Sequence, residues 1–227
     1  MMTISYVDES NKINANSIGR ISMRKLAPWF FITALVAAIG MIFYLNSASP
    51  DLIKNGKIVD PARTVDNFQL TDVNGQTVTK DIFQGKWSLV SFGFTSCPDI
   101  CPTTLSFFMQ EMKLINNDLS NSQFIFVSVD PERDKLDKIK SWVEYFHKDI
   151  VGLTGTEKQL VRFSGMFGAW FEPEKVPGSE EYTVNHPPYI YLVNPEGQWQ
   201  AYYGPPLKKG KIADDLNRLM APAAGSH

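Results

Sequence analysis

The sequence predicts an α/β domain that follows an N-terminal transmembrane helix. Three observations support this prediction. Residues 27–45 carry no charge, residues 87–94 form a nearly all-apolar run, and similar runs alternate with segments of helical periodicity over the rest of the chain. Strands that alternate with helices are typical of an α/β sheet with helices packed against it.

The composition excludes several classes of protein. The chain has 227 residues, of which 44% are hydrophobic, and a formal net charge of -2. Domains that bind nucleic acid usually carry a basic excess, so no nucleic-acid partner is expected. Two cysteines are too few for a disulfide-stapled scaffold. The numbers fit one soluble domain with an appendage.

The charge-free stretch at residues 27–45 is close to the roughly 20 residues that a helix needs to cross a bilayer. Basic residues precede it, so the positive-inside rule places residues 1–26 in the cytoplasm as a short tail. A cleaved signal peptide is the alternative, but this apolar run exceeds the usual apolar core of about 7–15 residues. Asp8 and Glu9 disfavour a mitochondrial transit peptide. We therefore expect a single-pass protein of the bacterial inner membrane, with its soluble domain in the periplasm.

The region after the anchor is predicted as a linker over residues 46–66 and a domain over residues 67–227. Asn74-Gly75 marks a hairpin within residues 66–79. Apolar runs predict strands at residues 87–94, 124–129, 189–193 and 199–203. Helical spacing predicts helices at residues 102–119, 134–146, 157–167 and 209–220. Residues 172–183 are predicted as a surface loop. A closing antiparallel strand pair followed by a helix is the thioredoxin-like arrangement, which is the predicted fold.

Cys97 and Cys101 lie between a predicted strand and a predicted helix, in the stretch SFGFTSCPDICPTTL. Pro102 suits the first turn of a helix, which places Cys101 near its N-terminus. The unpaired N–H groups and the dipole there favour thiolates, which bind metals or attack disulfides. Thioredoxin-type redox motifs use C-x-x-C, whereas this pair is one residue wider. The pattern leaves both redox and metal chemistry open.

His186 is the candidate third ligand. It precedes a predicted strand, at a loop that faces the cysteine loop in a thioredoxin-like sheet. His147 and His227 are expected to have no ligand role. Two thiolates and an imidazole suit copper or zinc. Structural zinc sites almost always have four protein ligands, and only three are found here. We therefore predict a copper ion held by Cys97, Cys101 and His186.

Three segments resemble the Sco/SenC family: GFTSCPDICPTTL, VSVDPERD and NHPPYIYLVNPEG. The resemblance covers residues 60–220. It implies a thioredoxin-like fold, a membrane anchor, and copper bound by Cys97, Cys101 and His186. It also implies a metallochaperone that assists assembly of the dinuclear copper site of cytochrome c oxidase, with the copper-site subunit as partner. Asn185 departs from the family, whose members often have Asp before the histidine.

Two alternatives remain open in the sequence. In a thiol–disulfide oxidoreductase, Cys97 would attack a target disulfide and His186 would be a bystander. A thiol peroxidase would use a reactive cysteine at the same place. The copper hypothesis predicts no substrate turnover, so enzymatic activity is not expected. Asp130 and Asp134 are interpreted as helix-capping residues, in preference to an acidic group near the site.

Overall fold

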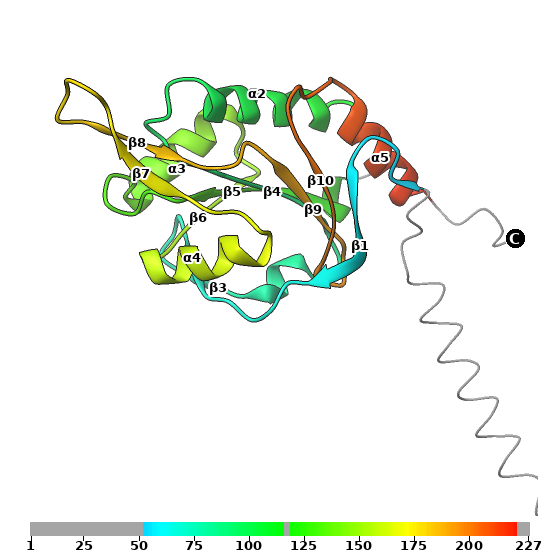
Figure 1. The fold of residues 1–227 in the computed structure, drawn as a ribbon. Helices are drawn as coiled ribbons and strands as arrows, with labels where there is room; N and C mark the ends of the chain where they lie inside the picture. Colours follow the sequence, from blue (N-terminus) through cyan, green and yellow to red (C-terminus); the bar gives the residue numbers. More distant parts are fainter. Residues whose placement is uncertain (1–51, 116–118, 222–227) are drawn as a thin grey trace, which may run out of the picture. The chain divides into compact units, whose positions relative to one another are not determined.

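The computed structural model describes residues 52–115 and 119–221, which form an α/β domain around one eight-stranded sheet (Figure 1). The predicted tail, the predicted anchor and His227 lie outside the described residues. Within those residues, no helix has the length and apolar character needed to cross a membrane.

The sheet has the strand order β1-β10-β9-β4-β5-β6-β2-β3. Its strands are β1 (Lys57–Thr64), β2 (Leu70–Asp72), β3 (Thr77–Val78), β4 (Trp87–Gly93), β5 (Ser122–Ser128), β6 (Ile150–Thr154), β9 (Ile190–Val193) and β10 (Gln198–Tyr203). The helices are α2 (Ile100–Met112), α3 (Leu136–Phe146), α4 (Glu157–Met166) and α5 (Lys211–Leu219), with 3-10 turns η2 (Lys80–Phe83) and η3 (Leu119–Asn121).

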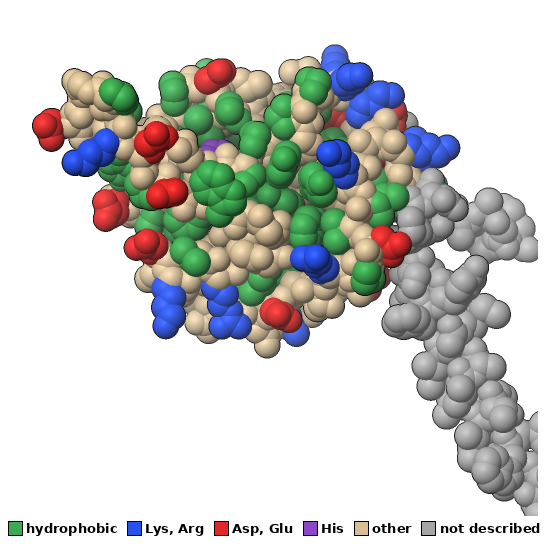
Figure 2. All heavy atoms as spheres, in the orientation of Figure 1, with side chains coloured by type: hydrophobic (Ala, Val, Ile, Leu, Met, Phe, Trp, Pro, Cys, Tyr) green, Lys and Arg blue, Asp and Glu red, His purple; other side chains and the backbone are tan. Residues whose placement is uncertain are grey.

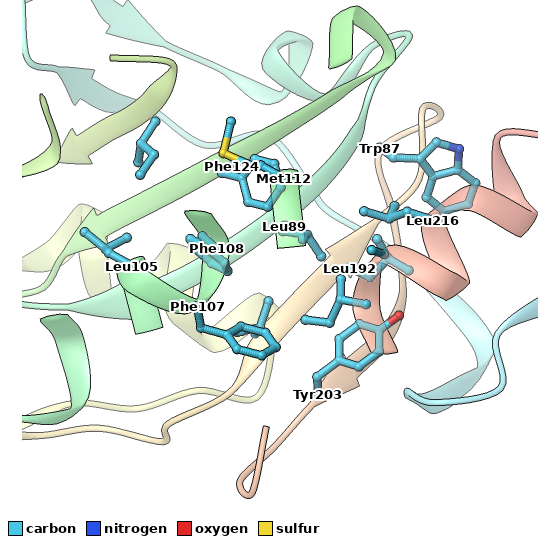
Figure 3. Packing of buried hydrophobic residues seen from close by; sticks show 14 of the residues in the cluster. Trp87, Leu89, Leu105, Phe107, Phe108, Met112, Phe124, Leu192, Tyr203 and Leu216 are labelled. Carbon is cyan, nitrogen blue, oxygen red and sulfur yellow. The ribbon is translucent and has the colours of Figure 1, made fainter. Parts of the chain in front are cut away.

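Strands β4, β5 and β6 run parallel at the centre of the sheet. Every residue of β4 and β5 is buried, which is expected where helices cover both faces of a sheet. Side chains alternate between the two faces. Leu89 and Phe124 pack with side chains of α2 and α5 (Figure 3) and with Ile139 and Val143 of α3. Val90 and Ile125 point the other way and pack with α4 and η2.

Asp215 of α5 ties the start of the described chain to its end. Its fully buried carboxylate accepts hydrogen bonds from the backbone N–H groups of Lys54 (3.0 Å), Asn55 (3.0 Å) and Gly56 (3.2 Å). It also accepts one from the Tyr203 hydroxyl on β10, at 3.0 Å. We call this group the Asp215 clasp.

A second, two-stranded sheet projects from the domain (Figure 1). It consists of β7 (Glu172–Lys175) and β8 (Tyr182–Asn185), which pair only with each other. All of β7 is exposed, whereas Val184 of β8 is buried against the core. We call this element the hairpin.

Several predicted boundaries were wrong. Residues 57–64, predicted as linker, form strand β1 and pair with β10. Residues 172–183, predicted as a loop, include β7 and the start of β8. Strand β6 was missed, although its sequence IVGLT is apolar. Helix α2 begins at Ile100 and ends at Met112, seven residues before the predicted end at residue 119.

Candidate metal centre

The two cysteines lie where β4 passes into α2, as predicted. The backbone N–H of Cys97 donates to the carbonyl of Phe94 (3.2 Å), which turns the chain after the strand. Cys101 stands in the first turn of α2, after Asp99 at the N-cap position. The exposed Asp99 makes no side-chain cap, and the backbone N–H groups of Asp99 and Cys101 instead hydrogen-bond to Cys97, where they favour negative charge. Cys101 is 3% exposed and Cys97 is half-buried.

Gly93 is a site residue that the sequence analysis missed. A Cβ atom at this position would lie 2.7 Å from the Cys101 sulfur and 2.8 Å from the Phe126 ring. The last residue of β4 therefore has to be glycine for Cys101 to pack against the strand. The signal was present in the GFTSC stretch, but a single glycine after an apolar run does not by itself indicate a close approach.

His186 directly follows β8, and the structure brings it to the cysteines. Its Nε2 lies 3.8 Å from the Cys101 sulfur, and its Nδ1 lies 3.2 Å from the Pro187 carbonyl oxygen. A carbonyl only accepts hydrogen bonds, so the neutral ring carries its proton on Nδ1. Nε2 then presents a lone pair to the sulfurs, which is the form that binds a metal.

The two thiols are driven to different protonation states. Hydrogen bonding by the Cys101 thiol lowers the pKa of Cys97 to about 3, and hydrogen bonds from the nearby backbone of Asp99 and Cys101 act in the same direction against partial burial. The pKa of Cys101 is raised, first by its hydrogen bond to Cys97 and then by burial. Cys97 is therefore the thiolate of the pair, and Cys101 keeps its proton until a metal or a base takes it.

Asp134 supports the cysteine loop and does not cap a helix, which corrects the sequence interpretation. Helix α3 begins at Leu136, after Lys135, without a side-chain cap. The Asp134 side chain is buried and accepts from the Thr95 N–H (2.7 Å), the Thr95 hydroxyl (2.5 Å) and the Ser128 hydroxyl (2.7 Å). It thereby fixes the residue two positions before Cys97 to the end of β5.

Asp130 is also buried and makes an ion pair, again in place of the predicted helix cap. Its carboxylate accepts from Arg133 Nε (2.5 Å) and from the Tyr182 hydroxyl (2.8 Å). Burial, followed by the hydrogen bond to Asp130, raises the pKa of Tyr182 to about 12. Tyr182 therefore remains a donor at neutral pH. Neither Arg133 nor Tyr182 was singled out in the sequence, although Arg133 lies within VSVDPERD.

The remaining predicted histidine lies elsewhere. His147 follows α3, where its Nδ1 accepts from the Asp149 N–H at 3.2 Å. Its side-chain contacts are with Asp149 and not with Cys97 or Cys101.

The donors fit a soft metal ion. Ligands at about 2.3 Å (sulfur) and about 2.0 Å (nitrogen) from one ion, as in zinc sites, are about 3.7 Å apart when they subtend 120°. The Cys101–His186 separation of 3.8 Å is close to this value. Across residues 52–115 and 119–221, no three acidic, cysteine or histidine side chains are already grouped as ligands of one ion. Metal binding therefore has to draw Cys97 into the pair.

The surroundings favour a cation. A groove of about 490 Å³ opens beside the cysteine loop, between Pro98 and the hairpin, and its charged lining residues are Glu180, Glu181 and Arg133, two acids against one base. Figure 2 shows acidic side chains gathered over the hairpin end of this face and basic ones over the α5 end. Acidic walls raise the local concentration of cations.

Comparison with known proteins identifies the family. The family model described as SCO1/SenC matches residues 57–221. The chain is 36% identical over 157 residues to the human mitochondrial protein SCO2 homolog, covering 68% of this chain and 59% of that protein. It is 31% identical over 210 residues to protein sco1 of Schizosaccharomyces pombe, covering 89% and 76%. The match thus spans less than two thirds of the human relative.

Solved structures agree. The copper-bound structure of Arabidopsis thaliana ScoI has a TM-score of 0.64 and 29% identity, covering 69% of this chain and 98% of that one. Copper-bound yeast Sco1 has a TM-score of 0.61 and 30% identity, covering 68% and 86%. The thioredoxin-like α/β fold predicted from the sequence is confirmed for the described residues. The chain belongs to the SCO1/SenC family.

Proposed function

We propose that this protein is a copper-binding metallochaperone that assists assembly of the dinuclear copper site of cytochrome c oxidase. The observation that carries the proposal is that His186 Nε2 lies 3.8 Å from the Cys101 sulfur, beside the loop that also carries Cys97, although the histidine lies 85 positions from Cys101. Related structures were solved with copper bound, and a further structure, of BsSco, is described as a member of the Sco family of cytochrome c oxidase assembly proteins. The partner is the copper-site subunit of the oxidase or another copper protein.

The copper ion is the cargo of such a protein and not a resident cofactor. Two thiolates and a neutral imidazole give Cu(I) a soft three-ligand site. Such a site leaves one side of the ion open, so a ligand from a recipient protein can approach. Cys97 supplies a thiolate at neutral pH, whereas Cys101 loses a proton on binding, so binding releases about one proton.

The proposal also includes the cellular location of the protein. Residues 27–45 anchor the protein in the bacterial inner membrane, and the copper-binding domain lies in the periplasm. The sequence pattern described above supports this placement. Cysteine labelling of the intact cell by a membrane-impermeant thiol reagent tests it: Cys97 is expected to react without permeabilising the inner membrane. Protection of Cys97 in intact cells would contradict the periplasmic placement.

A titration with Cu(I) tests the metal site. The full-length chain, reduced and purified in detergent without oxygen, is titrated with Cu(I) against a competing chelator. We expect one tightly bound ion, and a loss of at least tenfold in affinity for His186→Ala. His147→Ala is the matched control and should bind as the wild type does. Equal affinities of wild type and His186→Ala would remove His186 from the ligand set.

Reduction of a target disulfide is a second candidate function, favoured by the low pKa of Cys97 beside the protonated Cys101. The Cys97 thiolate would attack a target disulfide, release one target thiolate and form a mixed disulfide. Cys101, after losing its proton, would attack the Cys97 sulfur and release the second target thiol. Two electrons pass to the target, and a Cys97–Cys101 disulfide remains. This reaction should survive His186→Ala, whereas copper binding should not.

A further inference from the structure

His186 lies between the hairpin and the main sheet. It follows β8, which among the described residues pairs only with the exposed β7, and it precedes β9 by four residues. Its position relative to the cysteines therefore depends on β9 on one side and, on the other, on side-chain contacts between the hairpin and the domain. Val184 supplies an apolar contact, since it is 4% exposed and packs in the core. The polar contacts converge on Arg133.

Arg133 holds the first residue of β8 at several points. Its Nη1 donates to the Tyr182 carbonyl oxygen at 2.7 Å, and its guanidinium carbon lies 3.6 Å from the centre of the Tyr182 ring. Its Nε pairs with Asp130, which also accepts the Tyr182 hydroxyl at 2.8 Å. The backbone, the ring and the hydroxyl of Tyr182 are thus all fixed through one ion pair.

Arg133 also reaches the residue that leads into the cysteine loop. Its guanidinium carbon lies 5.5 Å from the centre of the Phe94 ring. The Phe94 carbonyl accepts the N–H of Cys97, and the Phe94 ring meets the His186 ring edge to face, with centroids 6.3 Å apart. Arg133 therefore contacts both segments that deliver ligands, four residues before His186 and three before Cys97.

We propose that Arg133 is a positioning residue for the copper site: it sets where His186 lies relative to Cys97 and Cys101 without binding the ion itself. The inference rests on the proposed copper-binding function. The guanidinium suits this task because it is planar, so it stacks on Tyr182 while its fork donates in two directions. A lysine could neutralise Asp130 but could not stack and donate at the same time. Simple neutralisation of the buried Asp130 is thus a separable, purely structural role.

A double-mutant cycle separates the two roles. Arg133→Lys, His186→Ala and the double variant are made in the full-length chain and titrated with Cu(I). Loss of a residue that orients a ligand typically costs 10–100-fold in metal affinity, so Arg133→Lys should bind about tenfold more weakly. In the His186→Ala background the same change should have a clearly smaller effect, because only the contact with Phe94 still links Arg133 to a ligand. An equal loss in both backgrounds, or no loss in either, would overturn the proposal.

A second readout uses the metal-free protein. Hydrogen exchange of the Tyr182–Asn185 amides should become about tenfold faster in Arg133→Lys, while exchange in β4 and β5 stays unchanged. Arg162→Lys, on the exposed side of α4, is the matched control and should change neither. Unchanged exchange in the hairpin would contradict the positioning role. If the wild type binds no Cu(I), the metallochaperone proposal fails, and the exchange result still decides whether Arg133 fixes the hairpin.

Discussion

The site receives its ligands from two regions that differ in how they are held. Strand β4 is buried throughout and hydrogen-bonded on both sides, to β5 and β9, so the cysteine loop starts from a fixed frame. The hairpin is exposed along β7, and within the described part of the chain its two strands pair only with each other. The cysteine pair thus follows a buried strand directly, whereas the histidine lies between the exposed hairpin and β9. A site for a transferable ion needs both: donors that stay in place and a donor that can be moved away.

The first prediction concerns the cysteine loop, which follows the buried strand β4. Because the pKa of Cys97 is lowered to about 3, its thiolate is present above that pH and is lost only as the pH falls through it. The rate at which Cys97 is alkylated in the metal-free protein should therefore stay constant from pH 5 to 8. Over the same range, the alkylation rate of an ordinary thiol with a pKa near 8.5 rises about a thousandfold.

The control for this profile is Cys101→Ala, which removes the largest cause of the lowered pKa. The pKa of Cys97 should rise, and a steeper dependence on pH should return. A wild-type rate that climbs tenfold per pH unit would show that the cysteine pair is not preorganised.

The second prediction also concerns β4 and the cysteine loop. Gly93→Ala places a methyl group 2.7 Å from the Cys101 sulfur, and the buried strand cannot retreat. We expect a loss of about 2 kcal/mol in the free energy of unfolding, as for an overpacked core, and about a hundredfold loss in Cu(I) affinity. Chemical denaturation and chelator competition measure the two.

Gly165→Ala is the matched control, because a Cβ there meets nothing within 4 Å. It lies inside α4, where alanine is favoured by about 1 kcal/mol, so the protein should be equally or more stable. Comparable damage from both changes would mean that the packing around Gly93 is not what positions Cys101.

The third prediction makes one chemical change in both regions. Val90 of β4 and Val184 of β8 are both buried, and each loses about 1.6 kcal/mol of burial on truncation to alanine, at about 0.8 kcal/mol per carbon. Val90→Ala should lower the global free energy of unfolding. Val184→Ala should instead raise hydrogen exchange about tenfold in the hairpin alone, because that element opens by itself. Equal global losses would remove the distinction between the regions.

The smallest effect is expected at Asn185, whose side chain donates to Glu174 across the hairpin at 2.5 Å. Asn185→Asp replaces this hydrogen bond with two facing carboxylates, which costs about 0.5 kcal/mol in a strand pair. We expect Cu(I) affinity to change two- to threefold, and the change to shrink at high salt as the charges are screened. Asn185→Ser, which adds no charge, should show no salt dependence.

The same division explains what the sequence could predict. Buried strands such as β4 and β5 leave long apolar runs, and the C-x-x-x-C spacing with a later histidine predicted three ligands, of which the structure brings His186 to within 3.8 Å of Cys101. The hairpin was predicted as a loop because EPEK and its neighbours are charged, with no apolar alternation. The roles of Asp134 and Arg133 could not be predicted from the sequence for another reason. Their roles depend on partners 39 and 49 positions away, Thr95 and Tyr182, and no local pattern records such pairs.

The Asp215 clasp lies where a pulling force on the N-terminal side of the domain would enter it. A pull along the chain from before residue 52 first meets the N–H groups of Lys54, Asn55 and Gly56, which one buried carboxylate holds. The force passes into α5 and β10, on the opposite side of Figure 1 from the hairpin. In a protein anchored as proposed, a pulling force from the membrane acts on the end of the domain that is remote from the proposed metal ligands. The hairpin then carries none of this force.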